Sequence, residues 1–196
     1  TVLFGYPLFN STLFNGISLL PSNSFLSVSE GRVIVHKHTA IEDLFEKDPL
    51  PWKGAVEETA ESFLESVRHY LPWEGYASSL TGGFDGRTLV AAGLALKRKF
   101  SAYSFGAEGA DDVGIASGLS AAAGIPFINI TLSRDYVERE SYGCGRDFVM
   151  NSSATSTFAR AHYLFAARRL SEGHDIIVTG NFGSEIFRAP HIAGSV

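Results

Sequence analysis

The chain has 196 residues, of which 45% are apolar and 19% charged, and its formal net charge is −5. This length and apolar content suffice for one domain with a sizeable core, or for one and a fraction. The acidic balance without a basic cluster argues against a nucleic-acid partner. No apolar run approaches the ~20 residues that a membrane span requires. The only cysteine, Cys144, excludes an internal disulfide, which fits a cytoplasmic protein.

The N-terminal quarter of the chain predicts a β-hairpin followed by a linker. Residues 24–28 and 32–36 alternate as strands around the turn Ser29-Glu30-Gly31. His36 and His38 alternate on the second strand, and because no second ligand pair accompanies them we expect no zinc site. Residues 47–54 are rich in proline and turn formers. We therefore expect a short N-terminal unit over 1–46 and a main domain over 55–196.

The main domain alternates between helix and strand patterns. Helices are predicted over 56–70, 87–99, 111–123 and 157–170, and strands over 76–80, 100–105, 127–131 and 175–179. Cys144 lies in the glycine-rich stretch 142–145, which is interpreted as a loop, and the cysteine as structural rather than nucleophilic. Repeated βα units predict an α/β fold, a doubly wound parallel sheet with helices on both faces.

The stretch Ser79-Leu80-Thr81-Gly82-Gly83-Phe84-Asp85-Gly86-Arg87 links the first of these strands to a helix. Its glycines allow backbone N–H groups to approach a ligand closely, and the helix start adds unpaired donors, which together suit a phosphate. Asp85 is placed to hold Mg²⁺ against that phosphate. The stretch is neither a Walker A loop nor a Gly-x-Gly-x-x-Gly fingerprint. The alternative is a plain glycine-rich turn in which Asp85 is the helix N-cap.

A second glycine-rich loop, residues 180–185, follows the fourth strand and ends in Glu185. If the first three strands run outward one way, the fourth lies beside the first on its other side. Ligands bind at the carboxyl ends of parallel strands where the winding reverses. The loops 81–87 and 180–185 are therefore expected to face each other across one crevice.

These motifs resemble those of a known family. The first loop resembles the pyrophosphate loop of ATP pyrophosphatases, Ser-Gly-Gly-x-Asp-Ser, with Thr81 in place of the first serine and Gly86 in place of the last. Four further segments resemble, in the right order, parts of the asparagine synthetase family; they are 13–21, 104–109, 151–154 and 179–187. The chain thus resembles the synthetase domain of that family, preceded over 1–46 by the tail of a glutaminase-like domain and a connector, and truncated before the family's later helical region.

The resemblance implies an ATP pyrophosphatase-type fold and a two-step reaction. ATP adenylates a substrate carboxylate with release of pyrophosphate, and ammonia then displaces AMP. The implied ligands are ATP, Mg²⁺, a small-molecule carboxylate and an ammonia source, and a homodimer is left open. By motif position, Asp85 and Glu185 are the catalytic acids, with Asp85 on the metal. The residues implied around ATP are Ser79, Thr81, Gly82, Gly83, Asp85, Gly86, Phe105, Gly106, Thr179 and Gly180.

Departures from the family pattern leave the substrate and the activity open. Asn181 and Ser184 stand where the family has acids that position ammonia and the substrate amino group. Arg87 and Arg188 are additional cations for a different carboxylate, or surface arginines. The main alternative is a non-catalytic relative that binds nucleotide as a regulatory or interaction module. Other ATP pyrophosphatases, tRNA-thiolating or NAD-synthesising, and a nicotinamide-dependent enzyme are weaker alternatives.

Overall fold

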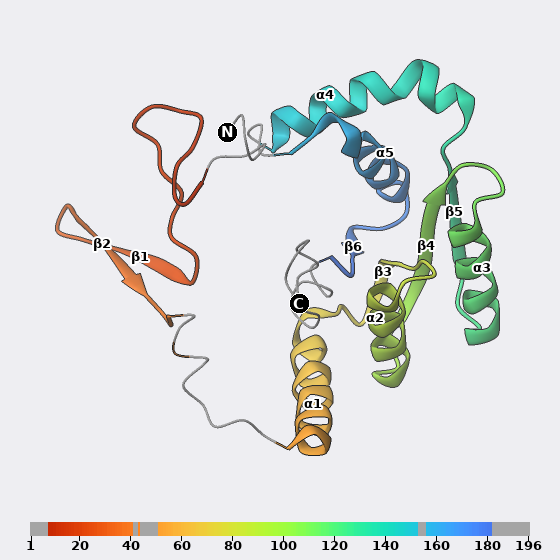
Figure 1. Cartoon of the computed structure of the whole chain (residues 1–196), viewed down its shortest axis with the longest axis horizontal. Coiled ribbons are helices and arrows are strands. Elements are labelled where there is room, and N and C mark those ends of the chain that lie inside the picture. Colours follow the sequence, from red (N-terminus) through yellow and green to blue (C-terminus); the bar gives the residue numbers. More distant parts are fainter. Residues whose placement is uncertain (1–7, 41–42, 44–50, 153–155, 182–196) are drawn as a thin grey trace, which may run out of the picture.

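The computed structural model describes residues 8–40, 43, 51–152 and 156–181. Within them lie a two-stranded antiparallel sheet and a four-stranded parallel sheet with helices around it (Figure 1). The predicted α/β class with an additional β-hairpin is confirmed. No helix of the described residues is long and apolar enough to cross a membrane.

The hairpin consists of β1 (Ser24–Ser29) and β2 (Arg32–Lys37), as the strand pattern predicted. Its turn residues, Glu30 and Gly31, have φ angles of 50° and 75°. Two successive positive φ angles define the type I′ turn, whose twist matches that of the flanking strands. Its apolar side chains are largely exposed, with Val28 at 70%. The division into units at 1–46 and 55–196 stays a prediction.

The parallel sheet has the strand order β5-β4-β3-β6, with β3 at Glu74–Ser79, β4 at Lys99–Gly106, β5 at Phe127–Thr131 and β6 at Ile176–Val178. The chain steps outward from β3 to β5 and then returns to pair β6 with the free side of β3. The winding therefore reverses between β3 and β6. This is the strand order expected from the sequence for the case in which the first three strands step outward in one direction.

Helices cover both faces of this sheet. On one face, α1 (Trp52–Tyr70), α2 (Phe84–Ala95) and α3 (Asp111–Ala123) supply side chains to a core with Tyr76 and Phe100. On the other, α4 (Ser141–Asn151) and α5 (Ala161–Leu170) pack on Ala77 and Tyr103. Neighbouring strand residues point to opposite faces, which is why the consecutive Tyr76 and Ala77 belong to different cores. The doubly wound architecture follows from these two cores.

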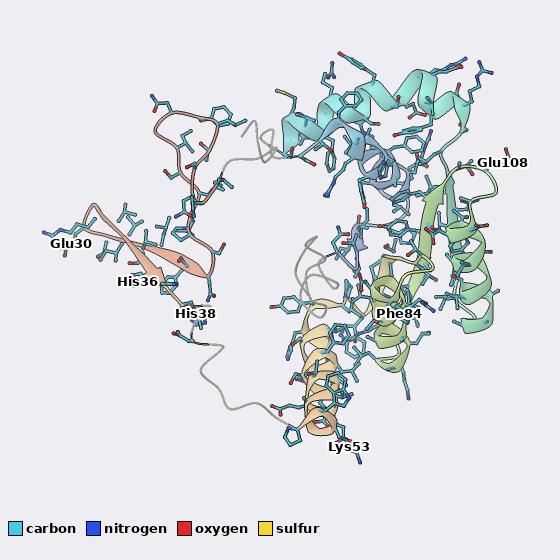
Figure 2. All side chains as sticks on the ribbon, viewed as in Figure 1. Glu30, His36, His38, Lys53, Phe84 and Glu108 are labelled. Atoms are coloured by element: carbon cyan, nitrogen blue, oxygen red, sulfur yellow. The ribbon has the colours of Figure 1, made fainter. Side chains whose placement is uncertain are left out.

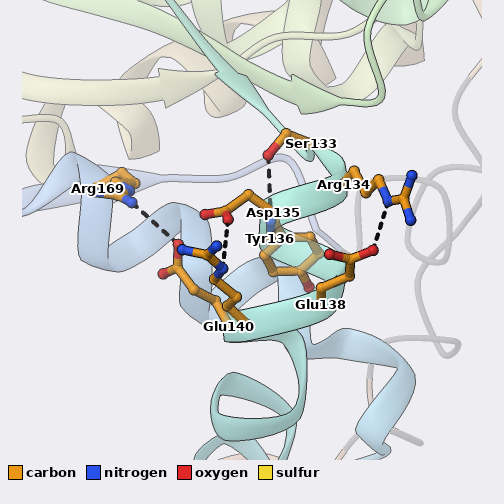
Figure 3. A network of polar contacts seen from close by, with 8 residues as sticks. Ser133, Arg134, Asp135, Tyr136, Glu138, Glu140 and Arg169 are labelled. Atoms are coloured by element: carbon orange, nitrogen blue, oxygen red, sulfur yellow. Dashed lines mark hydrogen bonds and ion pairs between the residues drawn. The ribbon is translucent and has the colours of Figure 1, made fainter.

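The helical segment between β5 and α5 was not predicted. A π-helical turn, Tyr136–Glu140, continues into α4, so the prediction of a loop around Cys144 is wrong. Cys144 is 1% exposed within the second core. Ion pairs hold this segment, including Arg139 to Asp135 at 2.9 Å and the link of Glu140 to Arg169 of α5 at 3.3 Å (Figure 3). The predicted helix 157–170 is a 3₁₀ turn, Phe158–Arg160, followed by α5.

Two helix starts also differ from prediction. α1 begins at Trp52, inside the predicted linker 47–54, with Pro51 as its N-cap. Proline is tolerated beside a helix start because the first N–H groups have no intrahelical partner. α2 begins at Phe84, three residues before the predicted position, with Gly83 as its N-cap. Asp85 therefore lies in the first helical turn, and the interpretation of it as the N-cap is wrong.

Candidate functional site

The glycine-rich turn joins the carboxyl end of β3 to the start of α2. A Cβ atom on Gly86 would lie 2.7 Å from the carbonyl oxygen of Ser79, so the helix start packs directly on the strand end. This contact gives a packing reason for glycine where the resembling family has serine. Asp85 occupies the first turn of α2. The N–H groups at a helix start form the positive end of the helix dipole, which suits an anion.

Two hydrogen bonds fix the shape of the turn. The Gly83 N–H donates to Thr81 Oγ1 at 3.1 Å, and the Gly82 N–H donates to Asp112 Oδ1 at 3.2 Å. Asp112 is in the first turn of α3, and its place beside the loop was not predicted. The topology could have predicted this position. The carboxyl ends of neighbouring parallel strands lie at one edge of the sheet, so the start of α3, which follows β4, lies near the loop that follows β3.

Arg87 folds back over the same turn. Its Nε donates to the Gly83 carbonyl oxygen at 3.1 Å, and its guanidinium lies 4.5 Å from the centre of the Phe84 ring. Phe84 itself is 68% exposed at the start of α2 (Figure 2). The guanidinium therefore lies beside the loop, where the sequence analysis expected Arg87 as an additional cation. A role of Arg87 in binding a carboxylate stays a prediction.

The loop after β6 meets the loop after β3. A Cβ atom on Gly180 would lie 2.8 Å from the carbonyl carbon of Asp85 and 2.9 Å from the Gly86 nitrogen. The predicted convergence of the two glycine-rich loops is thus confirmed at Gly180, and only glycine permits so close an approach. Thr179 and Asn181 are exposed on either side of it. Ser184, Glu185 and Arg188 lie outside the described residues.

The expected nucleoside side of the site is formed by the ends of β3 and β4. Ser79 pairs in register with Tyr103 in the parallel ladder. Burial raises the pKa of Tyr103 to about 12. The ring of Phe105 stands 5.2 Å from His162 and 5.4 Å from Tyr163 of α5. Burial lowers the pKa of His162.

Two cavities border the loop region. One, of about 860 Å³, is an apolar groove between α1 and α2 that extends to Phe84 and Asp85. The other, of about 840 Å³, lies past the ends of β4 and β5, between Glu108 and Ile115, with Asn129 and Thr131 on its wall. The side chain of Ile115 also approaches Gly82, which places this second cavity next to the loop. Both volumes fall in the range of small-molecule sites.

The donor set of the loop suits a hard cation held jointly with phosphate. Among the described residues, no three His, Cys, Asp or Glu side chains gather to hold a metal by themselves. Mg²⁺ is usually held by one or two carboxylates together with substrate phosphates. Asp85 and Asp112, the two carboxylates on and beside the turn, fit that description.

No protein-family model and no curated protein sequence matches this chain. Among solved structures, it is similar to NMN synthetase from Francisella tularensis, with 15% sequence identity and a TM-score of 0.40. The match covers 66% of this chain and 59% of that protein, so the chain spans less than two thirds of its length. The architecture described above rests on the strand order and the two cores of this chain itself.

Proposed function

We propose that this chain is an ATP-dependent adenylating domain of the ATP pyrophosphatase type, which joins AMP to a substrate carboxylate and releases pyrophosphate. The observation that carries the proposal is the packing of Gly180 on Asp85 and Gly86. It brings two glycine-rich loops together at the point where the winding reverses, which is where open α/β sheets bind ligands. The sequence resemblance of both loops to asparagine synthetase supports it.

The residues around the turn would have different roles according to their charge. The N–H groups at the start of α2, with Arg87 beside them, would offset the charge that builds on the leaving pyrophosphate. Asp85 would hold Mg²⁺, which acts as a Lewis acid on the phosphates when bound. The cavity beside Glu108 and Ile115 would receive the nucleoside, although Ser79 and Phe105, which the resemblance places around AMP, do not line it. The substrate carboxylate would approach from the side of Thr179 and Asn181.

We further propose, from the resemblance alone, that ammonia completes the reaction by displacing AMP to form an amide. The acyl substrate differs from that of asparagine synthetase, because Asn181 and Ser184 lack the acids of that family. An amide-forming ligase therefore stands as the finer form of the proposal.

A second candidate is a non-catalytic domain that binds the nucleotide only. Gly86 favours it, because glycine lacks the hydroxyl with which the serine of the resembling family would contact pyrophosphate. A serine would also not fit there, since its Cβ would lie 2.7 Å from the Ser79 carbonyl oxygen. The exposed, uncharged Asn181 favours it too. This candidate predicts binding of ATP without any exchange of pyrophosphate into it.

The experiment has two stages. Calorimetry of Mg-ATP binding compares the wild type, Asp85→Asn and the matched control Asp175→Asn, which removes one charge from an exposed position directly before β6, at the opposite edge of the sheet. We expect the affinity to fall at least about tenfold in Asp85→Asn, the loss of one charge-assisted contact, and to stay within about twofold in the control. Pyrophosphate exchange is then measured against a panel of carboxylates. ADP as the only product would contradict adenylation, and ATP binding without exchange would favour the second candidate.

A further inference from the structure

Both glycine N–H donors of the turn are already engaged inside the protein. Gly82 donates to Asp112 and Gly83 donates to Thr81. The first acceptor is a carboxylate, which brings to the loop the same negative charge as a phosphate oxygen. The proposed phosphate site therefore contains an anion of the protein's own.

The structure shows why Asp112 reaches this position. It lies in the first turn of α3, where the helix dipole favours a carboxylate. A Cβ atom on Gly82 would lie 3.0 Å from Asp112 Oδ1 and 3.3 Å from Ile115 Cδ1, so a side chain at position 82 would crowd the carboxylate. Asp112 is exposed, and its contact with Gly82 can open without stranding a buried charge.

We propose that Asp112 is a competing anion that makes this site selective for the magnesium complex of ATP over free ATP. A phosphate oxygen that takes the Gly82 N–H must displace the carboxylate or lie against it. Two like charges in such close contact repel each other, and the repulsion is reduced but not removed by the solvent around an exposed carboxylate. In the magnesium complex the same carboxylate faces a neutralised phosphate and is available as a ligand of the cation.

The inference rests on the proposed function, because Asp112 would act at the same nucleotide site. Its test uses Asp112→Asn, which keeps an oxygen acceptor for the Gly82 N–H and removes only the charge. The matched control is Asp175→Asn, an exposed residue directly before β6, at the edge of the sheet opposite to the loops. Binding of ATP is measured by calorimetry for each protein, once with excess Mg²⁺ and once with a chelator.

We expect Asp112→Asn to bind metal-free ATP about tenfold or more tightly than the wild type, equivalent to 1.4 kcal/mol or more. The ratio of affinities with and without Mg²⁺ shrinks accordingly, while Asp175→Asn keeps the wild-type ratio. A structural role alone would not change this ratio.

Three results would overturn the inference. If the wild type binds Mg-ATP but Asp112→Asn binds metal-free ATP no more tightly than the wild type, Asp112 does not compete with phosphate. The proposed function would then still stand. A loss of Mg-ATP affinity with no gain in metal-free affinity would make Asp112 a metal ligand only. Absence of Mg-ATP binding by a wild type that is folded by circular dichroism would overturn the proposed function itself, and the inference with it.

Discussion

The start of α2 rests so closely on the end of β3 that position 86 has no room for a side chain. A Cβ atom there would lie 2.7 Å from the Ser79 carbonyl oxygen, and 3.4 Å from Leu80 Cα. Ordinary van der Waals contact begins at 3.4 Å, so the contact with Ser79 falls short by the difference of 0.7 Å. Both partners are backbone, and neither can rotate away. In Gly86→Ala the helix itself must move off the strand.

The magnitude follows from two opposing effects. Overpacking of this kind costs about 1–3 kcal/mol, whereas alanine in a helix gains about 0.5–1 kcal/mol over glycine. The packing cost wins, and we expect Gly86→Ala to lower the free energy of unfolding by about 1–2 kcal/mol. The matched variant is Gly118→Ala, an exposed glycine in α3 whose Cβ would meet nothing within 4 Å. There only the helical gain remains, about 0.5–1 kcal/mol.

Urea unfolding followed by far-ultraviolet circular dichroism measures both variants against the wild type. The midpoint should fall for Gly86→Ala and rise for Gly118→Ala, with similar slopes for both. Because residue 86 adjoins Asp85, the first variant should also bind Mg-ATP more weakly. A Gly86→Ala protein as stable as Gly118→Ala would refute the contact between helix and strand on which the loop geometry depends.

Three further predictions concern the side of the sheet that α4 and α5 cover. Gly145→Ala should cost at most about 1 kcal/mol through overpacking, because its Cβ would lie 2.7 Å from the ring of Phe158, which is 46% exposed and can turn aside, and because alanine gains about 0.5–1 kcal/mol over glycine in a helix. The cost should vanish in a Phe158→Ala background, and a double-mutant cycle without coupling would speak against this contact. The Cys144 thiol, 1% exposed, should react with a thiol reagent only as the chain unfolds, and rapid labelling of the folded protein would contradict its structural role. Since burial lowers the pKa of His162, the unfolded chain takes up a proton first as the pH falls through about 6.5. The free energy of unfolding should therefore decrease below about pH 6.5, by less than about 1.4 kcal/mol per pH unit for this one group, and more steeply in the wild type than in His162→Phe; equal slopes would exclude the effect.

The sheet could be predicted from the sequence because its rules are topological. Alternating βα units imply parallel strands, and a chain that has stepped outward from β3 to β5 can return a further strand to the free side of β3, as β6 does. The helix α4 could not be predicted in the same way. Its glycines, Gly143 and Gly145, indicate a loop, and the reason for Gly145 is a ring, Phe158, that packs on it from a distant turn. Tertiary packing here overrides local propensity.

In the candidate site too, the features that follow from strand order could be predicted and those that depend on tertiary packing could not. The meeting of the two glycine-rich loops follows from strand order and was predicted, and the structure adds the Gly180 contact that realises it. The partner of Gly82 is Asp112, 30 positions along the chain, and no local pattern connects the two. The sequence showed that Gly86 lacks the hydroxyl of the serine in the resembling family. Its packing against Ser79 could not be predicted, because it depends on how the helix and the strand are placed together.

The central claim is that the loops after β3 and β6 form one nucleotide site, and hydrogen exchange measured by mass spectrometry tests it most directly. Peptides covering 81–87 and 176–181 are followed with and without Mg-ATP, in the wild type and in Asp85→Asn. The account predicts that both peptides of the wild type become protected together at the same ATP concentration, and that neither does in the variant. Protection of only one of the two, or of neither at saturating Mg-ATP, would contradict it.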